Sequence, residues 1–402
     1  MKRFIVVQLG ARRNYNVPGI FSKGGLLEAF YTDLCADVGL GSIVSRLFPT
    51  FLRRGLINNL LSRKLPKCLR GITYSSTIPS LKYFLRKWLA HEDTERSVKV
   101  MNLFNIEFGN DLIRHGIGNA SHIYAMSGEG TPFIRFAKKR GLTVVTEFYS
   151  LLSAYFIEEA ERRRFPGVEP NLSTKQVEEI FEWLAEVCSL SDWVIVPSEA
   201  VRRDMVENFN FPMNRCFIVP YGIASTWFDI KNNPIRGTIL FVGNACFCKG
   251  IHIVGMAASN LKNRNYIFRV AGNVSQNIRN HNLTKNLKFL RYLSGTGIQR
   301  EFSQADIFVL PSLAEGSAMV TYEALAVGLP VITTQAAGSV VRDGIEGFIV
   351  PEGNAEILAA RIEELIENRQ LRDRMSFAAK ERAKEYTLEK YGERLLSVIK
   401  LL

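Results

Sequence analysis

The chain has 402 residues, 47% of them hydrophobic, which is enough for two domains with cores of ordinary size. No apolar run approaches the roughly 18 residues of a membrane-spanning helix, which argues against an integral membrane protein. The apolar start of the chain, up to Leu9, is too short for the hydrophobic region of a secretion signal. These features predict a cytoplasmic protein.

The six cysteines form no C-x2-C pair, and the closely spaced pair at 246 and 248 has no second pair to complete a zinc site. The five histidines are scattered singly, and no two aspartates stand two positions apart. We therefore expect free thiols in a reducing compartment, no metal and no cofactor. The cysteines are Cys35, Cys68, Cys188, Cys216, Cys246 and Cys248.

The net charge is +12, and the positive charge is concentrated in the first part of the chain. Residues 1–125 hold 18 Lys and Arg against 8 Asp and Glu. Within them, residues 38–91, which we call the basic segment, hold ten cations and no acidic residue. Large aromatic residues are interleaved with these cations, namely Phe48, Phe51, Tyr83, Phe84 and Trp88.

Three interpretations of the basic segment stay open. It can lie on an anionic bilayer at the inner face of the membrane, with cations at the head groups and rings at the interface. It can equally be a solvated basic face whose aromatic residues belong to the core. Nucleic-acid binding is the weakest interpretation, because no nucleic-acid motif accompanies the charge.

In chain order, residues 4–9 predict a buried strand and residues 26–36 a helix, with the pair Gly24-Gly25 directly before the helix. Glycine lets a backbone approach a ligand closely, and the first N–H groups of a helix are free to bind anions. The glycine pair is therefore a candidate ligand loop.

From residue 120 onward, strands and helices alternate in a rhythm typical of a parallel sheet. Residues 223–236, which contain a proline and two asparagines, read as a linker, and the strand after it ends at Gly243. The expected strands are 122–126, 142–146, 193–196, 238–243, 266–272, 287–293, 307–310, 331–333 and 347–350, and the expected helices include 131–140, 158–164, 174–189, 355–384 and 387–402.

The segment 305–334 carries the strongest functional signal, because it reads as a strand, a loop of small residues, a helix and another strand. Gly316 and Ser317 are expected to begin the helix, whose N-terminus then lies at the carboxyl edge of a parallel sheet. The first N–H groups of this helix would form an anion site suited to a phosphate. These groups belong to Ser317, Ala318, Met319 and Val320.

Two carboxylates flank this anion site. Glu315 lies just before it, and Glu323 lies about six residues into the helix, roughly 9 Å along its axis. Carboxylates so close to a phosphate would repel it unless each accepts hydrogen bonds from hydroxyls on either side of a diphosphate. A nucleotide sugar has this layout. The alternative is that Glu315 ends a loop and Glu323 is a solvated helix residue.

Glu315, Gly316 and Glu323 in this frame resemble the E-x7-E signature of the retaining glycosyltransferases of family GT4. The Pro-Ser-Glu turn at 197–199 agrees with that family in order and spacing, and the resemblance is strong over residues 190–390. It implies the GT-B fold, an α/β architecture in which two Rossmann-like domains with parallel sheets face a central cleft.

The resemblance also implies domain boundaries. Residues 1–222 would be the N-terminal, acceptor-binding domain, residues 223–236 the linker, and residues 237–386 the nucleotide-sugar-binding domain. The last helix, 387–402, is expected to pack back on the first domain, as in other GT-B proteins.

The resemblance further implies roles for site residues. Lys249 and Glu315 would be catalytic, the lysine offsetting charge on the diphosphate and Glu315 holding the sugar's hydroxyls. Glu323 would bind the ribose hydroxyls, and the helix N–H groups the diphosphate. The loop near Leu293 would receive the nucleotide base. Further donor contacts are expected from Gly24, Gly25, Gly243, Asn244 and Gly316.

Two positions depart from the family pattern. Asn244 replaces a common arginine, so one cation of the phosphate clamp is absent or supplied elsewhere. Glu147, Phe148 and Tyr149 stand where many relatives carry a histidine near the reacting sugar. Glu147 is then a candidate sugar or acceptor ligand in place of that histidine.

These features predict a metal-independent transferase that moves a sugar from a nucleotide diphosphate sugar to an acceptor, with retention at the anomeric carbon. The expected acceptor is a lipid-linked or cell-surface saccharide, as in polysaccharide or lipopolysaccharide biosynthesis. One alternative is a nucleotide-sugar epimerase of the same fold, which would form product without an acceptor. The other is a non-catalytic nucleic-acid or scaffold protein, which would show steep salt dependence of binding.

Overall fold

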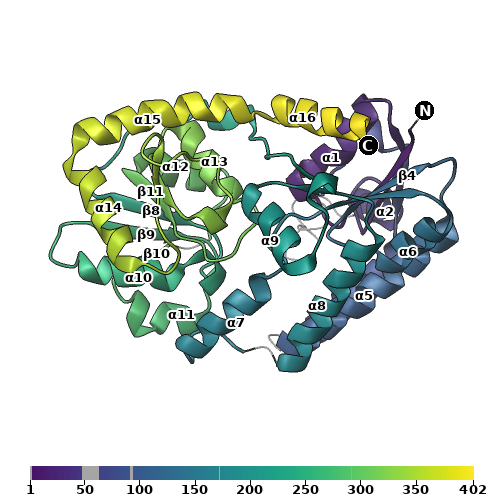
Figure 1. Ribbon diagram of the computed structural model, residues 1–402, viewed down its shortest axis with the longest axis horizontal. Coiled ribbons are helices and arrows are strands. Elements are labelled where there is room, and N and C mark those ends of the chain that lie inside the picture. Colours follow the sequence, from purple (N-terminus) through teal and green to yellow (C-terminus); the bar gives the residue numbers. More distant parts are fainter. Residues whose placement is uncertain (1, 48–62, 91–93, 172, 291) are drawn as a thin grey trace.

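The computed structural model describes residues 2–47, 63–90, 94–171, 173–290 and 292–402. Two sheets flanked by helices form the two halves of the molecule (Figure 1). The first has the strand order β3-β2-β1-β4-β5-β6-β7 and the second β10-β9-β8-β11-β12-β13. All neighbouring strands of both sheets run parallel, as the sequence predicts.

The central strands are short apolar runs, because helices cover both faces of each sheet. The first sheet contains β1 (Phe4–Val7), β2 (Leu27–Thr32), β3 (Thr73–Ser75), β4 (His122–Met126), β5 (Thr143–Glu147), β6 (Trp193–Val196) and β7 (Cys216–Ile218). The second contains β8 (Thr238–Val242), β9 (Ile267–Ala271), β10 (Leu287–Phe289), β11 (Ile307–Leu310), β12 (Val331–Thr333) and β13 (Gly347–Ile349). All residues of β1 and β11 are fully buried.

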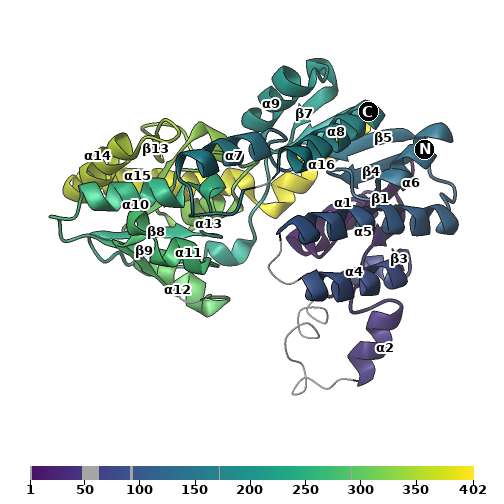
Figure 2. The same ribbon diagram turned by 90° about the horizontal axis from the view of Figure 1, so that it is seen from below.

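Helices of the first domain surround its sheet, and α5, α4 and α2 extend outward from it (Figure 2). They are α1 (Asn16–Lys23), α2 (Leu40–Leu47), α4 (Thr77–Ala90), α5 (Thr94–His115), α6 (Thr131–Lys139), α7 (Ala154–Arg164), α8 (Thr174–Leu190) and α9 (Glu199–Phe209). The later helices are α10 (Ile251–Asn260), α11 (Gln276–Asn280), α12 (Thr296–Gln304), α13 (Met319–Val327), α14 (Ala355–Glu367), α15 (Arg369–Ala383) and α16 (Leu388–Leu401). Of the helices in the described ranges, none is long and apolar enough to span a membrane.

The prediction of a helix over residues 26–36 is wrong, because this segment forms β2 and the helix α1 precedes it. Phe30 of β2 pairs with Val6 of β1 inside the buried sheet. Pro18 and Gly19 lie within α1, and their low helix propensity hid that helix in the sequence. Gly25, with φ of +68°, then turns the chain from the end of α1 toward β2.

The chain crosses between the domains twice, and the two crossings lie side by side. Ile223 in the first crossing forms a parallel bridge with Thr387 in the second. A Cβ added to Gly222 would lie 2.5 Å from the carbonyl oxygen of Thr387. The backbones of the two crossings are therefore in direct contact at this glycine. After this point α16 packs on α1, and the Nζ of Lys2 donates to the carbonyl oxygen of Lys400 at 2.8 Å.

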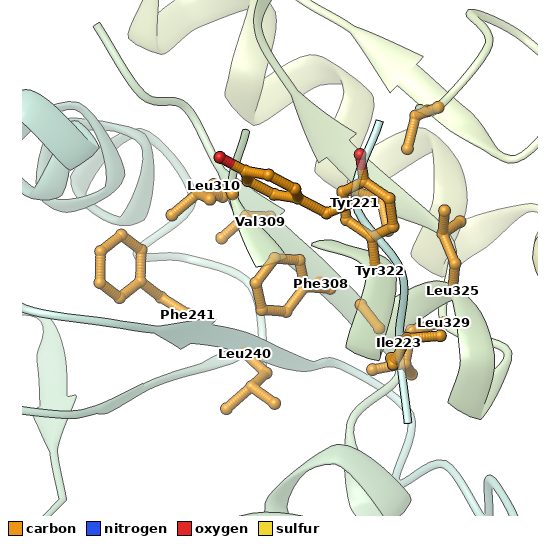
Figure 3. Packing of buried hydrophobic residues seen from close by; sticks show 14 of the residues in the cluster. Tyr221, Ile223, Leu240, Phe241, Phe308, Val309, Leu310, Tyr322, Leu325 and Leu329 are labelled. Carbon is orange, nitrogen blue, oxygen red and sulfur yellow. The ribbon is translucent and has the colours of Figure 1, made fainter. Parts of the chain in front are cut away.

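The first crossing is anchored in the core of the second domain (Figure 3). Tyr221 and Ile223 are 5% and 2% exposed, and they belong to the same hydrophobic cluster as Phe308 of β11 and Tyr322 of α13. The crossing is therefore tied to the two elements between which the predicted anion site lies.

Candidate active site

The carboxyl ends of the two sheets meet at Gly316. A Cβ added to Gly316 would lie 1.7 Å from the carbonyl oxygen of Tyr149, which follows β5 in the first domain. Ser198, the N-cap of α9, donates from its Oγ to the carbonyl oxygen of Gly316 at 2.6 Å. Gly338 also packs against the carbonyl oxygen of Gly316, since a Cβ added to Gly338 would lie 2.0 Å from that oxygen. Gly316 therefore serves the contact between the domains and has no room for a side chain.

Lys249 and Glu315 form an ion pair beside this contact. Lys249 ends the short 3-10 helix η6 (Phe247–Lys249), and Glu315 lies in the loop between β11 and α13. The Oγ of Ser312 donates to Glu315 Oε2 at 3.0 Å. Burial alone would lower the pKa of Lys249, but the carboxylate of Glu315 outweighs this effect and raises it, so the lysine stays charged. The structure thus brings the two predicted catalytic side chains together.

The loop that follows β8 leaves room for the side chain of Lys249. Gly243 has φ of +146°, and a Cβ added to it would lie 3.0 Å from the Cδ of Lys249. The glycine therefore lets the lysine side chain pass closely over the strand end. Asn244 is exposed, and its Oδ1 accepts a hydrogen bond from the Nδ2 of Asn273 at 3.3 Å.

Helix α13 begins later than predicted, at Met319, and Ser317 does not cap it. The Oγ of Ser317 instead shares a hydrogen bond of 2.9 Å with the hydroxyl of Tyr322. The N–H of Ala318 donates to the carbonyl oxygen of Ala337 at 3.0 Å and is not available to a phosphate. Met319 and Val320 are partly exposed, and as the first helical residues their N–H groups have no acceptor within the helix. The predicted anion site therefore has fewer free N–H groups than the four that the sequence predicts.

Glu323 lies in the second turn of α13 and is partly exposed. Burial raises its pKa to about 7, and no charged or hydrogen-bonding group in the described part of the chain offsets this effect. A half-buried carboxylate without a protein partner is suited to accept hydrogen bonds from a ligand's hydroxyls.

Leu293 lies in the loop that follows β10 and is partly buried. A Cβ added to Gly297, at the start of α12, would lie 3.6 Å from the Cδ2 of Leu293. The loop is at the carboxyl edge of the second sheet, the edge at which β11 and β8 also end. The contact of Leu293 with a nucleotide base stays a prediction.

Glu147 is held in a buried network and does not face open space. Its side chain is 1% exposed, and it forms an ion pair with Arg13. It also accepts hydrogen bonds from the hydroxyls of Tyr124 at 2.6 Å and Tyr221 at 3.2 Å. Arg13 in turn donates to the hydroxyl of Tyr391 at 2.9 Å. The geometry argues against the predicted contact of Glu147 with sugar or acceptor and makes it a positioning residue.

The network around Glu147 includes a loop with strained backbone at residues 13–15. Arg13, Asn14 and Tyr15 have φ of +49°, +52° and +59°, a region that residues other than glycine rarely adopt. Strain of this kind collects at ligand sites, where surrounding contacts hold the backbone in place. The ion pair between Arg13 and Glu147 supplies such a contact at the carboxyl edge of the first sheet.

Gly24 and Gly25 do not lie at this edge, so the geometry argues against their predicted contact with the donor. Gly24 caps the C-terminus of α1, and β2 begins at Leu27, two residues after Gly25, so both glycines lie at the amino end of that strand. A Cβ added to Gly24 would lie 2.9 Å from the Cδ2 of Leu396 in α16. Gly24 therefore allows the terminal helix to pack on α1.

Sequence reasoning missed a cavity of about 560 Å³ at the carboxyl edge of the first sheet, which we call the first-domain pocket. Arg12 and Glu129 are among the residues that line it. Glu129 Oε2 accepts a hydrogen bond from the backbone N–H of Leu9 at 2.5 Å, and its Oε1 lies 2.9 Å from the Nη2 of Arg12. The strand predicted at residues 4–9 places the residues that follow it, including Arg12, at the carboxyl edge of the first sheet. This position is the signal that could have indicated Arg12 as a site residue.

In the part of the chain that the structure describes, no group of three or more His, Cys, Asp or Glu side chains is arranged to hold a metal ion. All six cysteines are free, and the Sγ atoms of Cys246 and Cys248 lie 3.5 Å apart.

Residues 226–382 match the family model described as glycosyl transferases group 1. An uncharacterized glycosyltransferase of Methanocaldococcus jannaschii is 28% identical over 207 residues, 50% of this chain and 57% of that protein. A glycogen synthase of Mycobacterium tuberculosis is 25% identical over 251 residues, 59% of this chain and 60% of that protein. The amylovoran biosynthesis glycosyltransferase AmsK of Erwinia amylovora is 28% identical over 170 residues, 37% of this chain and 41% of that protein. The chain thus spans less than two thirds of the length of these relatives.

Two solved structures share the fold along the whole chain. Sucrose-phosphate synthase from Thermosynechococcus elongatus has a TM-score of 0.69 and 13% identity, and the match covers 100% of this chain and 99% of that one. The Anabaena protein HepE, solved with UDP and glucose, has a TM-score of 0.65 and 13% identity, with full coverage of both chains. At such low identity the likeness shows the fold alone. It confirms the predicted GT-B fold.

Proposed function

We propose that the chain transfers a sugar from a nucleotide diphosphate sugar to an acceptor, because residues 226–382 match the family model of group 1 glycosyl transferases and the chain has the GT-B fold. The observation that carries the proposal is the arrangement of Lys249, Glu315 and Glu323 around the start of α13. One cation and two carboxylates at a helix N-terminus match the diphosphate and the two sets of hydroxyls of such a donor.

Each part of the donor has a partner in this proposal. The diphosphate is bound by Lys249 and by the N–H groups of Met319 and Val320, at the positive end of the helix. Glu323 accepts hydrogen bonds from the ribose hydroxyls, and Glu315 from hydroxyls of the sugar. Lys249 and Glu315 lie close enough to pair, so a donor placed here meets both side chains at once.

The reaction proposed is a transfer with retention and without a metal ion. The bond between the anomeric carbon and the diphosphate oxygen breaks, and the acceptor oxygen bonds to that carbon on the same face. The proton of the acceptor hydroxyl passes to an oxygen of the departing diphosphate. Lys249 and the helix N–H groups stabilise the charge on that diphosphate, and one such donor is typically worth about 2.7–4 kcal/mol of barrier.

UDP sugars are the first donors to test, because the solved structure of HepE contains UDP and glucose. The acceptor is proposed to be a lipid-linked or cell-surface saccharide. The amylovoran biosynthesis enzyme among the relatives supports a place in polysaccharide synthesis.

We further propose that the first domain binds an anionic membrane surface through α4, which Figure 2 shows on the outside of that domain. Five apolar residues, spaced three, four, three and one apart, form a stripe on one face of α4, and they are between 47% and 67% exposed. We call this set the α4 stripe: Ile78, Leu81, Leu85, Trp88 and Leu89.

The structure divides the aromatic residues of the basic segment between the core and the surface. Tyr83 stacks on Phe104 of α5 with ring centroids 4.5 Å apart, whereas Trp88 is 67% exposed. Phe48 and Phe51 lie outside the described residues. The exposed stripe, together with the cations of residues 38–91, supports the membrane surface over a purely solvated face.

Donor hydrolysis tests the proposed reaction without knowledge of the acceptor. The purified protein is incubated with UDP, GDP and ADP sugars, and the configuration of the first sugar released is followed by proton NMR. We expect slow hydrolysis of one donor series with retention. Release with inversion would contradict the proposed mechanism, and isomerised donor in place of free sugar would indicate the epimerase instead.

A further inference from the structure

Two cysteines lie side by side in the loop that carries Lys249. Cys246 and Cys248 are both free and partly exposed, and their Sγ atoms are 3.5 Å apart. We propose that this pair, which we call the thiol pair, is a modification site: a small-molecule disulfide oxidises it to an intramolecular disulfide, and this change displaces Lys249 and Glu315. The thiol chemistry is independent of the proposed function, whereas its effect on turnover rests on that function.

The thiol pair is close to the geometry of a bond. The sulfur atoms of a disulfide lie about 2 Å apart, so the two Sγ atoms have to approach by about 1.5 Å. A single residue separates the cysteines, and the ring that the bond closes is therefore short. Short rings restrict the chain strongly, so closure changes backbone angles as well as side-chain angles.

The two thiols differ in the way that thiol–disulfide exchange requires. A hydrogen bond with Cys248 lowers the pKa of the Cys246 thiol, and the same contact raises the pKa of Cys248. The thiolate is the species that attacks a disulfide, so Cys246 is the nucleophile. Cys248 lies within reach of Cys246 and is the resolving thiol.

The exchange takes two steps. In the first, the thiolate of Cys246 attacks one sulfur of the small disulfide, whose S–S bond breaks as a mixed disulfide forms and one small thiolate leaves. In the second, Cys248 loses its proton and attacks the Sγ of Cys246, and the other small thiolate leaves. The two small thiolates take up the protons that the protein thiols lost. The thiol pair is thus oxidised by two electrons, and the small disulfide is reduced to two thiols.

The other cysteines of the chain lack this arrangement. Cys35, Cys188 and Cys216 are buried, and burial raises the pKa of each of these thiols, which makes them poor nucleophiles. Cys68 is exposed, and it lies in the 3-10 helix η3 (Lys67–Leu69) of the first domain. Cys68 therefore serves as the control for an exposed thiol outside the donor loops.

The backbone of the thiol pair holds both donor loops. The carbonyl oxygen of Cys246 accepts a hydrogen bond from the N–H of Lys249 at 3.2 Å. The carbonyl oxygen of Cys248 accepts hydrogen bonds, at 2.8 and 3.2 Å, from the N–H groups of the two residues directly before Glu315. A turn of the peptide units at Cys246 and Cys248 therefore moves Lys249 and Glu315 together.

Phe247, between the two cysteines, directs the movement to these peptide units. Its side chain is fully buried, and its ring packs against the ring of His252 with centroids 4.6 Å apart. Since this anchor holds the middle of the loop in place, the change in backbone angles falls on Cys246 and Cys248. The hydrogen bonds that their carbonyl groups make to the donor loops are then broken or displaced.

Peptide mapping tests the modification site without any donor. Trypsin cleaves after Arg236 and Lys249, so residues 237–249 form one peptide that contains the thiol pair and no other cysteine. The protein is treated with excess oxidised glutathione and then with N-ethylmaleimide. We expect this peptide to be lighter by two hydrogen atoms and to carry no maleimide. Maleimide on both cysteines, or glutathione on both, would overturn the proposal.

Serine variants assign the two roles. In Cys248→Ser the exchange should stop at the mixed disulfide, with glutathione on Cys246. In Cys246→Ser the remaining thiol of Cys248 should react about tenfold or more slowly, because its pKa is raised. The control Cys68→Ser should form the disulfide at the same rate as wild type. Equal reaction rates of the two single thiols would overturn the assignment of Cys246 as the nucleophile.

Donor hydrolysis by each protein before and after treatment tests the effect on the donor site. We expect oxidation to slow hydrolysis by wild type and Cys68→Ser about tenfold or more, because the charge stabilisation by Lys249 is lost, and dithiothreitol to restore it. Hydrolysis by Cys246→Ser should not change on treatment. A disulfide that forms without slowing hydrolysis would overturn the displacement of Lys249 and Glu315. Absence of donor hydrolysis by the reduced protein would overturn the proposed function, while the peptide map still decides the modification site.

Discussion

The carbonyl oxygen of Tyr149 lies so close to the backbone of Gly316 that a Cβ on Gly316 would be only 1.7 Å from it. This contact joins the end of β5 in the first domain to the loop that carries Glu315 in the second. The position of the proposed catalytic carboxylate relative to the first domain therefore depends on a residue without a side chain.

Gly316→Ala is expected to lower the free energy of unfolding by about 1–3 kcal/mol, because the added methyl group has no space. It should also slow donor turnover, since Glu315 moves with the loop. Urea denaturation and donor hydrolysis measure the two effects. Gly71→Ala is the control, as no atom lies within 4 Å of a Cβ there. Equal behaviour of the two variants would show that the contact with Tyr149 is unimportant.

Lys249→Gln is expected to reduce the turnover of donor by about 100-fold or more, because the lysine stabilises charge that builds as the diphosphate leaves. The Michaelis constant for the donor should change much less than the turnover number. Steady-state hydrolysis or transfer kinetics separate the two. Lys262→Gln, at an exposed lysine of the same domain, is the control. A large rise in the Michaelis constant at unchanged turnover would assign Lys249 to binding alone.

Glu147→Gln is expected to destabilise the fold by about 3–5 kcal/mol, since it leaves the buried guanidinium of Arg13 without its counter-charge. Urea denaturation measures this loss, with Glu356→Gln at an exposed position as the control. Folded protein that remains should keep its affinity for the donor and the acceptor. A stable Glu147→Gln variant that has lost acceptor binding would instead make Glu147 a ligand.

Replacing Leu85 and Trp88 by serine is expected to reduce binding to anionic vesicles, because both belong to the exposed α4 stripe. Co-sedimentation with phosphatidylcholine vesicles, with and without phosphatidylglycerol, measures the effect. Phe377→Ser is the control, since Phe377 is 70% exposed but lies on α15 of the second domain. Wild-type protein that stays in solution with both kinds of vesicle would rule out the membrane surface.

Much of the fold follows from local sequence pattern. The structure has β4 and β6 at the predicted residues 122–126 and 193–196, because short, largely apolar runs between polar turns are characteristic of buried parallel strands. The segment 26–36 was unpredictable by the same rule. This segment forms a strand because it pairs with β1. The helix α1 before it contains Pro18 and Gly19, whose low helix propensity argues against a helix in the sequence.

The candidate site was predictable where it depends on spacing and not where it depends on distant contacts. Lys249 and Glu315 form an ion pair at the carboxyl edge of the second sheet, the edge to which the sequence assigned both residues. The N–H of Ala318 donates to the carbonyl oxygen of Ala337 and so cannot bind an anion, and no local sequence pattern indicates this contact. Glu147 is enclosed by side chains from three other segments of the chain, and the first-domain pocket assembles from helices and loops far apart in sequence.

The pKa of Glu323 gives the proposed donor site a specific pH dependence. Burial raises this pKa to about 7, so the folded protein holds a proton that the unfolded chain has already lost. The contribution of Glu323 to the free energy of unfolding therefore falls as pH rises toward about 7. Donor affinity should change in the opposite direction, because the ionised carboxylate is the better acceptor for ribose hydroxyls.

Titration calorimetry of the preferred nucleotide sugar against wild-type protein, Glu323→Gln and the control Glu356→Gln tests the central claim most directly. We expect wild-type and control affinity to increase as pH rises through about 7. Glu323→Gln should bind about tenfold or more weakly at high pH, as for loss of a hydrogen bond to a charged group, and without that pH dependence. Equal affinity and equal pH dependence of Glu323→Gln and wild type would contradict the donor site at the start of α13.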